Sequence, residues 1–191
     1  ARWADLHTSM GLLLHQGEQA QDFLRRLGLI RTRMDEVLQS RTDDSLFVLV
    51  QMLLDRTVGY CTSHALLCAL LCRIAVKLLL KETAAPDSLI NAALTMNIGM
   101  SRLQDELALQ AEPPSPEQRA RIDQHPMSGV RVLQHLGVND ENWLRLVRHH
   151  HAKLPTLTDL ERAEPQLLFA HLISLVDVFV ARISPRVSRK G

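Results

Sequence analysis

The sequence predicts an all-α protein, and three observations carry this prediction. From His64 to Leu78, apolar residues recur three and four residues apart and form one continuous stripe on a helix. No segment alternates apolar and polar residues in the way that a half-buried strand does. Proline, glycine and small polar residues divide the chain at intervals typical of helix ends.

Amphipathic segments predict helices in the N-terminal part of the chain, at residues 3–26, 30–40 and 43–57. Gly28 is expected to end the first helix, and Thr42 with the two aspartates after it is expected to cap the last. We expect residues 1–57 to pack on a second unit, residues 58–191, or to form a dimer interface.

The apolar stripe that begins at His64 predicts a buried helix with His64 on its inner face. Pro86 and Asp87 are expected to begin the next helix, which carries Met96 and Asn97. Both segments therefore place polar or sulfur-containing side chains close to the predicted core.

The proline-rich stretch at residues 112–117 predicts a break between helices. Within it, Ser115 followed by Pro116 is typical of an N-cap and a first helical position, so a helix is expected to run on to His125.

Gly137 is expected to end the helix that contains His125. Asn139 or Asp140 then caps a helix that leads into His149, and a long apolar helix is expected at about residues 164–184.

Composition limits the classes of function. A chain of 191 residues with 46% hydrophobic residues can bury one compact core. With 22 basic and 21 acidic residues, the net charge of +1 offers no general attraction for nucleic acid or an anionic membrane. Three cysteines are too few for a disulfide framework, and no apolar run is as long as a membrane span. We therefore expect a soluble, cytoplasmic chain that forms part of a longer protein.

Five segments lie in order between about residues 60 and 189: residues 63–67, 93–100, 118–133, 143–151 and 175–186. Together they resemble the HD-GYP family within the HD superfamily of metal-dependent phosphohydrolases. The resemblance implies an HD-type helical bundle with additional N-terminal helices, metal ligands, and a phosphate-binding arginine. The residues that match the family's ligand and arginine positions are His64, His125 (followed by Pro126 and Gly129), His150, His151, Asp177 and Arg186.

The chain departs from the family at the positions that bridge its two metal ions. The family's His-Asp pair and the lysine after it are Met96, Asn97 and Met100 here, and an acidic ligand before the first histidine is Tyr60. The Gly-Tyr-Pro loop that names the family is also missing. A thioether binds hard cations poorly and a carboxamide is a weak bridge, so we expect no binuclear centre.

Two remnants of the centre have open interpretations. By the resemblance, His125, His150 and His151 mainly served one metal, and three imidazoles can still hold zinc or iron. Alternatively, the histidines at 149–151 simply end a helix and His125 packs beside Pro126. Our first expectation is therefore no cofactor, with a single divalent ion (Fe, Mn or Zn) as the alternative.

The second remnant is the pair His64 and Asp177. An ionised Asp177 among apolar neighbours needs a partner. Without a cation, His64 could donate a hydrogen bond to it.

Other candidates favour structural roles. Met96 and Met100 are more typical of core side chains than of copper ligands. The isolated histidines are expected in packing or surface positions: His7, His15, His135 and His171. A basic cluster near the C-terminus could hold a phosphate, but the solvated end of a helix is the preferred interpretation: Arg182, Arg186, Arg189 and Lys190.

Three functional hypotheses remain. The first is a non-catalytic signalling module of cyclic di-GMP pathways, which binds cyclic di-GMP or a protein partner such as a diguanylate cyclase domain. The second is a weakened cyclic di-GMP phosphodiesterase with one metal on the three histidines. The third is the related HDOD group, which resembles a metal-free regulatory version of the same core. A homodimer is compatible with all three, whereas nucleic acid and membrane are not expected partners.

Overall fold

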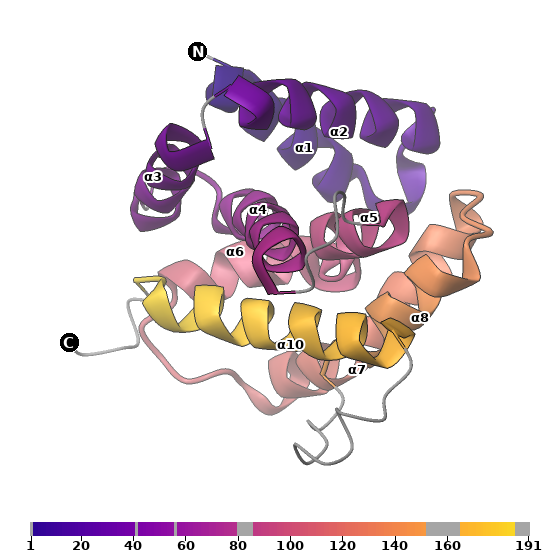
Figure 1. Cartoon of the computed structure of the whole chain (residues 1–191). Coiled ribbons are helices and arrows are strands. Elements are labelled where there is room, and N and C mark those ends of the chain that lie inside the picture. Colours follow the sequence, from indigo (N-terminus) through magenta and orange to yellow (C-terminus); the bar gives the residue numbers. More distant parts are fainter. Residues whose placement is uncertain (1, 41, 56, 80–85, 152–164, 186–191) are drawn as a thin grey trace.

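A computed structural model describes residues 2–40, 42–55, 57–79, 86–151 and 165–185, and every regular element in these residues is a helix (Figure 1). The all-α prediction is therefore confirmed. The elements are α1 (Arg2–Gln16), η1 (Gly17–Gln19), α2 (Phe23–Ser40), α3 (Thr42–Leu54), α4 (Tyr60–Leu79), α5 (Asp87–Thr95), η2 (Ile98–Met100), α6 (Ser101–Leu109), α7 (Pro116–His135), α8 (Glu141–His149) and α10 (Pro165–Ile183).

The N-terminal helices differ from the prediction in their boundaries. The chain turns between α1 and α2 at Gly17, which has φ +52°, whereas Gly28 lies inside α2 and does not end it. The helix continues because Phe23, Leu27 and Ile30 keep the apolar period and are all buried. That burial exceeds the cost of about 1 kcal/mol for a glycine in a helix.

Helix α4 occupies the middle of the fold and packs against α1, α3, α5, α6 and α10 (Figure 1). By length and composition, Tyr60–Leu78 is apolar enough to cross a membrane, but 67% of that window is buried inside the fold. This burial is typical of a core helix. As predicted, His64 faces inward and is 1% exposed.

The segment after α5 turns sooner than expected. Met96 and Asn97 do not continue the helix, because α5 ends at Thr95 and Met96 forms its C-cap. Met96 is nevertheless buried, as predicted for a core side chain. The following turn, η2, lies against the backbone of α7: a Cβ on Gly99 would stand 2.7 Å from the His125 carbonyl oxygen.

The ends of α7 and α8 follow the sequence signals. Ser115 and Gln118 form a reciprocal capping box at the start of α7. Gly137, with φ +87°, follows the end of α7. Of the two candidate caps for α8, Asp140 is the one whose carboxylate accepts from the first backbone N–H groups.

One core joins the N-terminal helices to the rest of the chain. Buried residues of α1 and α2 belong to the same cluster as those of α4, α5, α8 and α10. Trp143 on α8 connects α2 and α5, since its ring stacks on Phe23 of α2 and its Nε1 donates to Thr95 Oγ1 of α5 at 2.9 Å. This packing fixes the end of α8, where two of the candidate ligands lie.

Candidate metal centre

All five side chains that the resemblance assigned as metal ligands come together, from four helices. They form two neighbouring groups, in each of which the candidate ligand atoms lie within 4.8 Å of one another. The three-His cluster consists of His125 on α7 and of His150 and His151 at the end of α8. The His64 cluster consists of His64 and Cys68 on α4 and Asp177 on α10.

The orientation of His125 follows from the proline beside it. In a helix, the carbonyl of Ile122 would accept from the N–H of residue 126, but Pro126 has none. The freed carbonyl instead accepts from Nδ1 of His125. The His125 ring therefore carries its proton on Nδ1, and its Nε2 is left with a lone pair.

His150 is oriented in the same way by the end of a helix. Because α8 ends at His149, the carbonyl of Val147 is one of the last-turn acceptors without a partner inside the helix. It accepts from Nδ1 of His150 at 2.7 Å. His150 thus also carries its proton on Nδ1 and presents a lone pair on Nε2.

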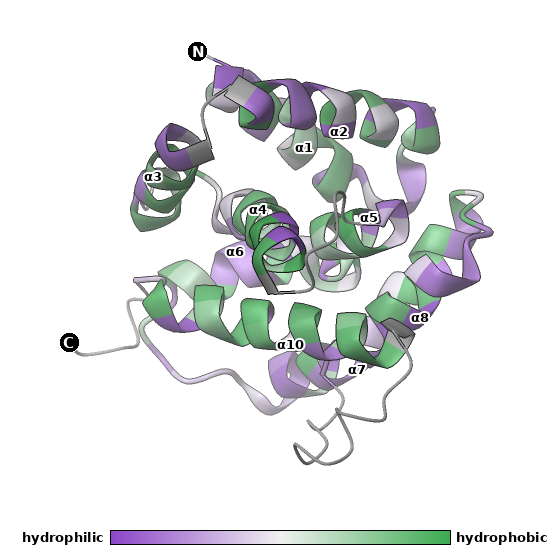
Figure 2. Cartoon of the chain, viewed as in Figure 1, coloured by the Kyte–Doolittle hydropathy of each residue, from purple (hydrophilic) through white to green (hydrophobic). Residues whose placement is uncertain are grey.

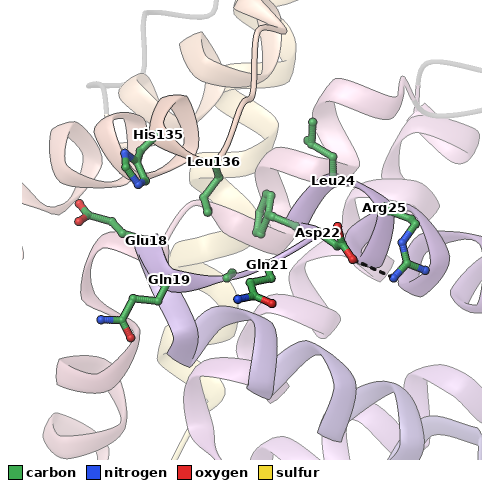
Figure 3. A pocket seen from close by; sticks show the side chains of 10 residues that line it. Glu18, Gln19, Gln21, Asp22, Leu24, Arg25, His135 and Leu136 are labelled. Atoms are coloured by element: carbon green, nitrogen blue, oxygen red, sulfur yellow. Dashed lines mark hydrogen bonds and ion pairs between the residues drawn. The ribbon is translucent and has the colours of Figure 1, made fainter.

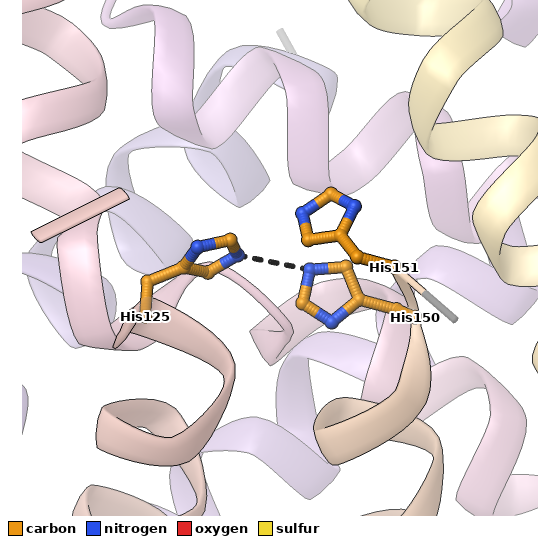
Figure 4. A group of neighbouring side chains, drawn as sticks. All are labelled: His125, His150 and His151. Carbon is orange, nitrogen blue, oxygen red and sulfur yellow. Dashed lines mark hydrogen bonds between the residues drawn. The ribbon is translucent and has the colours of Figure 1, made fainter. Parts of the chain in front are cut away.

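The two lone pairs face each other. Nε2 of His125 and Nε2 of His150 are 3.0 Å apart (Figure 4), and both rings are fully buried. Two unprotonated nitrogens at this distance repel unless a proton or another cation lies between them. The arrangement, in which backbone acceptors hold Nδ1–H and direct Nε2 inward, is the one that orients metal-ligating histidines.

At neutral pH, neither ring binds the additional proton that would remove this repulsion. Burial lowers the pKa of His125 to about 4, against a smaller raising effect of its bond to the Ile122 carbonyl. Burial, followed by the neighbouring histidines, lowers the pKa of His150 to about 3. Rotating either ring would leave a buried carbonyl without its donor. A metal cation between the two Nε2 atoms would remove the repulsion without protonating a buried ring and without breaking a hydrogen bond to a carbonyl.

The spacing suits such an ion. With metal–nitrogen bonds of about 2.0–2.1 Å, two nitrogens on one ion stand about 2.9–3.4 Å apart at ordinary bond angles. The 3.0 Å contact between His125 and His150 falls in this range. His151 supplies a third nitrogen from a side chain that is 46% exposed, so the cluster opens to solvent on the side of His151.

The His64 cluster has no comparable conflict. Nε2 of His64 donates to Oδ1 of Asp177 at 2.8 Å, and Nδ1 of His64 lies 3.2 Å from the Tyr60 hydroxyl, which can donate to it. The expected hydrogen bond between His64 and Asp177 is therefore present. Cys68 contributes a thiol whose pKa burial raises well above its usual value, so it stays protonated. This cluster is satisfied by protein groups alone.

Asp177 is ionised and stands between the two clusters. Burial alone raises the pKa of its carboxyl, but the hydrogen bond that it accepts from His64, together with the electrostatic effect of His64, His150 and His151, outweighs burial and lowers the pKa to about 2. Its second oxygen, Oδ2, lies 3.9 Å from Nδ1 of His151. That is an ion-pair distance, so Asp177 is close to the three-His cluster without being hydrogen bonded to it.

The remaining positions of the family's binuclear centre do not fit two ions. Met96 is buried and offers only a thioether, and Met100 is half-buried at the end of η2. Asn97 is 7% exposed, and its Oδ1 has no hydrogen-bond partner in the described part of the chain. This amide is a neutral oxygen ligand at best, and no carboxylate of the described residues replaces the missing bridge.

Other predicted residues lie elsewhere. Arg186, the candidate phosphate ligand, is outside the described residues. His15 binds Asp105 at 2.7 Å, and Asp105 also accepts from the backbone N–H of Cys61 at the start of α4. These contacts give His15 a structural role rather than ligation. His171 is buried, and neither ring nitrogen has a hydrogen-bond partner among the described residues.

A separate hollow of about 530 Å³ lies where the start of α2 meets the end of α7 (Figure 3). Its polar lining residues are all exposed, and two of them, Asp22 and Arg25, form an ion pair of 3.3 Å. His135 and Leu136 close the other side. A shallow, solvated lining of this kind does not single out a ligand.

Sequence reasoning missed how the histidines are oriented. The signal was present at His125, since a proline directly after a helical histidine frees the carbonyl three residues before it. Tyr60 was interpreted only as a lost ligand, whereas its hydroxyl contacts His64. The approach of Gly99 to Gly129, with 2.6 Å between an added Cβ and the Gly129 nitrogen, depends on tertiary packing and has no local signal.

Comparison with known proteins adds no assignment: no family model, no curated protein and no solved structure matches the chain.

Proposed function

We propose that this chain is a non-catalytic regulatory module that holds one transition-metal ion on His125, His150 and His151. The facing Nε2 atoms of His125 and His150 carry this proposal, because they form a buried, oriented pair of ligands that a cation completes. Bound there, an ion would supply Lewis acidity at a solvent-facing coordination position.

The regulatory part of the proposal is supported by the His64 cluster. In the resemblance to HD-GYP proteins, His64 and Asp177 belong to a second metal position, but here they bind each other at 2.8 Å. The neighbouring ligand positions hold Met96 and Asn97. A centre with a single ion suits a domain that binds its ligand without hydrolysing it. By the same resemblance, its ligand or partner belongs to cyclic di-GMP signalling, as cyclic di-GMP itself or a diguanylate cyclase domain.

Metal titration of the purified chain tests this proposal. After chelation and dialysis, Zn²⁺, Mn²⁺ and Fe²⁺ are titrated in turn by calorimetry, and the metal content is measured by mass spectrometry. We expect one equivalent of a transition metal, with imidazole favouring Zn²⁺ or Fe²⁺ over Mn²⁺. His150→Gln should weaken binding by more than the 10–100-fold that is typical of losing a supporting hydrogen bond.

The neighbouring histidine provides a matched control. His149 precedes His150 but is exposed and belongs to neither cluster, so His149→Gln should bind the metal like the parent chain. His135→Gln controls for a histidine on α7 in the same way. A parent chain that binds no transition metal, or a His149→Gln variant that loses binding as His150→Gln does, would refute the site.

One observation favours a second candidate, a weakened metal-dependent phosphodiesterase. Asp177 is ionised, and its Oδ2 lies 3.9 Å from His151, so a carboxylate stands beside the three-His cluster where a base would be needed. Hydrolysis of cyclic di-GMP by the metal-loaded chain separates the two candidates. Turnover that is lost in His150→Gln supports the phosphodiesterase, whereas metal binding without turnover supports the regulatory module.

A further inference from the structure

Helix α10 is hydrophobic over most of its length (Figure 2), and several of its large apolar side chains are exposed. A helix that is hydrophobic all round is normally buried on all sides. On α10, however, only one side is covered: Ile173, Val176 and Val180 are buried, while Leu175 and Phe179 are each 53% exposed. The outer side of α10 is therefore a helix face that no other described element covers.

The apolar residues of this outer side follow a definite spacing. Leu168, Leu172, Leu175 and Phe179 are separated by four, three and four residues, and we call these four residues the outer seam. Leu175 and Phe179 are exposed, whereas Leu168 and Leu172 are half-buried and Leu172 also packs against the core. This is the repeat that places side chains along one line of a helix and packs them into the holes of a second helix. The spacing therefore specifies an α-helix as the partner.

The outer seam is also complementary to itself in reverse. When two copies of α10 run antiparallel about an axis between residues 172 and 175, Leu172 meets Leu175 of the other copy, and Leu168 meets Phe179. Each layer then pairs an a-type with a d-type position, as in antiparallel coiled coils, and each layer is wholly apolar. No seam residue is left facing a charge from the seam of the other copy.

The exposed area supports a dimer of this kind. Three further apolar side chains flank the seam, each between 37% and 43% exposed: Leu167, Val178 and Ile183. Together, the seam and these flanks present on the order of 500 Å², near the upper limit for the largest apolar patch on a monomer. A stable interface covers about 800 Å² on each partner, so the surface around the two paired helices must bury the rest.

We infer that the chain forms a twofold symmetric homodimer through the outer seam of α10, with the two α10 helices antiparallel. This inference does not depend on the proposed metal. Asp177 projects from the opposite, buried side of α10, so pairing through the seam leaves the contact between Asp177 and His64 inside each copy.

Sedimentation velocity of the full chain over a range of concentrations tests the inference. We expect a dimer at micromolar concentration. Leu175→Asp and Phe179→Asp should each raise the dissociation constant by about 30-fold or more, because each buries a charge at the centre of the interface. The matched control is Phe47→Asp on α3, which is 65% exposed on another surface and should leave the dimer intact. Circular dichroism melts establish that the variants remain folded.

Cross-linking then tests the antiparallel direction. With a short thiol cross-linker, Leu175→Cys near the axis should link to its own copy, whereas Leu168→Cys and Phe179→Cys, which meet across the interface, should link only when the two variants are mixed. The three native cysteines are buried and serve as the unreactive background. A chain that stays monomeric at about 100 µM, a dimer dissolved by Phe47→Asp but not by Phe179→Asp, or self-linking of Leu168→Cys would each overturn the inference.

Discussion

Each cluster of the candidate centre combines buried histidine with further potential metal ligands, yet the hydrogen bonding of the two clusters differs. In the His64 cluster, each ring nitrogen of His64 has a partner of the right polarity, Asp177 on one side and the Tyr60 hydroxyl on the other. In the three-His cluster, His125 and His150 each donate their single ring N–H to a backbone carbonyl. Their unprotonated Nε2 atoms then face each other. One cluster is complete, and the other leaves two acceptor nitrogens facing each other.

This difference shows that burial and proximity do not by themselves identify a metal site. Both groups bring three candidate ligand atoms within 4.8 Å of one another. What separates them is the position of the ring protons, which is set by Pro126 in one helix and by the end of another. The predictions below test whether the clusters behave as differently as their hydrogen bonds indicate.

The largest effect is expected from removing the carboxylate of the complete cluster. Asp177→Ala should lower the free energy of unfolding by about 3 kcal/mol in chelated protein, because His64 loses its partner in a buried environment. Asp177→Asn keeps an oxygen that can accept from His64 and should lose only about half as much. Urea denaturation measures both, and an equal loss in the two variants would show that the pair does not stabilise the fold.

The incomplete cluster should make the metal-free fold sensitive to mild acid. In the unfolded chain, His125 and His150 take up protons near pH 6.5, whereas burial lowers the pKa in the fold to about 4 and about 3. Their contribution to stability is therefore present above pH 6.5 and is lost as the pH falls toward those values. Between pH 7 and pH 5, the loss should be about 3 kcal/mol for the two histidines together.

Denaturation of chelated protein at several pH values measures this loss, and His150→Gln should reduce it by about half. Asp177 acts in a lower window, since its stabilising effect is lost only as the pH falls from 3.8 to about 2. Unchanged stability between pH 7 and pH 5 would mean that the pair already shares a proton at neutral pH, which removes the argument for a metal.

A third prediction disturbs the three-His cluster through its backbone. In Gly99→Ala, the new Cβ would stand 2.6 Å from the Gly129 nitrogen and 2.7 Å from the His125 carbonyl oxygen, so η2 and α7 must separate. We expect a loss of about 2 kcal/mol in stability and a 10–100-fold loss in metal affinity. The control is Gly28→Ala, where nothing lies within 4 Å and a small gain in stability is expected.

Most of the fold was predictable from the sequence, because helix period and end signals are local. The buried face of α4, the capping box at Ser115 and the cap at Asp140 all followed from neighbouring residues. The prediction failed at Gly28, where tertiary burial of Leu27 and Ile30 outweighs a helix-breaking preference.

For the site, the sequence and its resemblance identified which residues meet but not their protonation. The hydrogen bond between His64 and Asp177 was expected because a buried carboxylate needs a donor. The opposed lone pairs of His125 and His150 could not be read from spacing, since they depend on how the end of α8 is positioned against α7. That arrangement is a property of the packing between helices.

The smallest effect is expected from Tyr60→Phe, and it tests whether the two clusters are independent. Removing the hydroxyl leaves Nδ1 of His64 without its partner at 3.2 Å, which should cost about 1 kcal/mol of stability. Metal affinity should change by less than about threefold, because the three-His cluster takes its orientation from backbone carbonyls and not from His64. Calorimetric titration of the variant measures this. A tenfold loss of affinity would instead show that Asp177, held by His64, is itself a ligand of the ion, since its Oδ2 is already 3.9 Å from His151. The His64 cluster would then help to hold the metal ion in the three-His cluster.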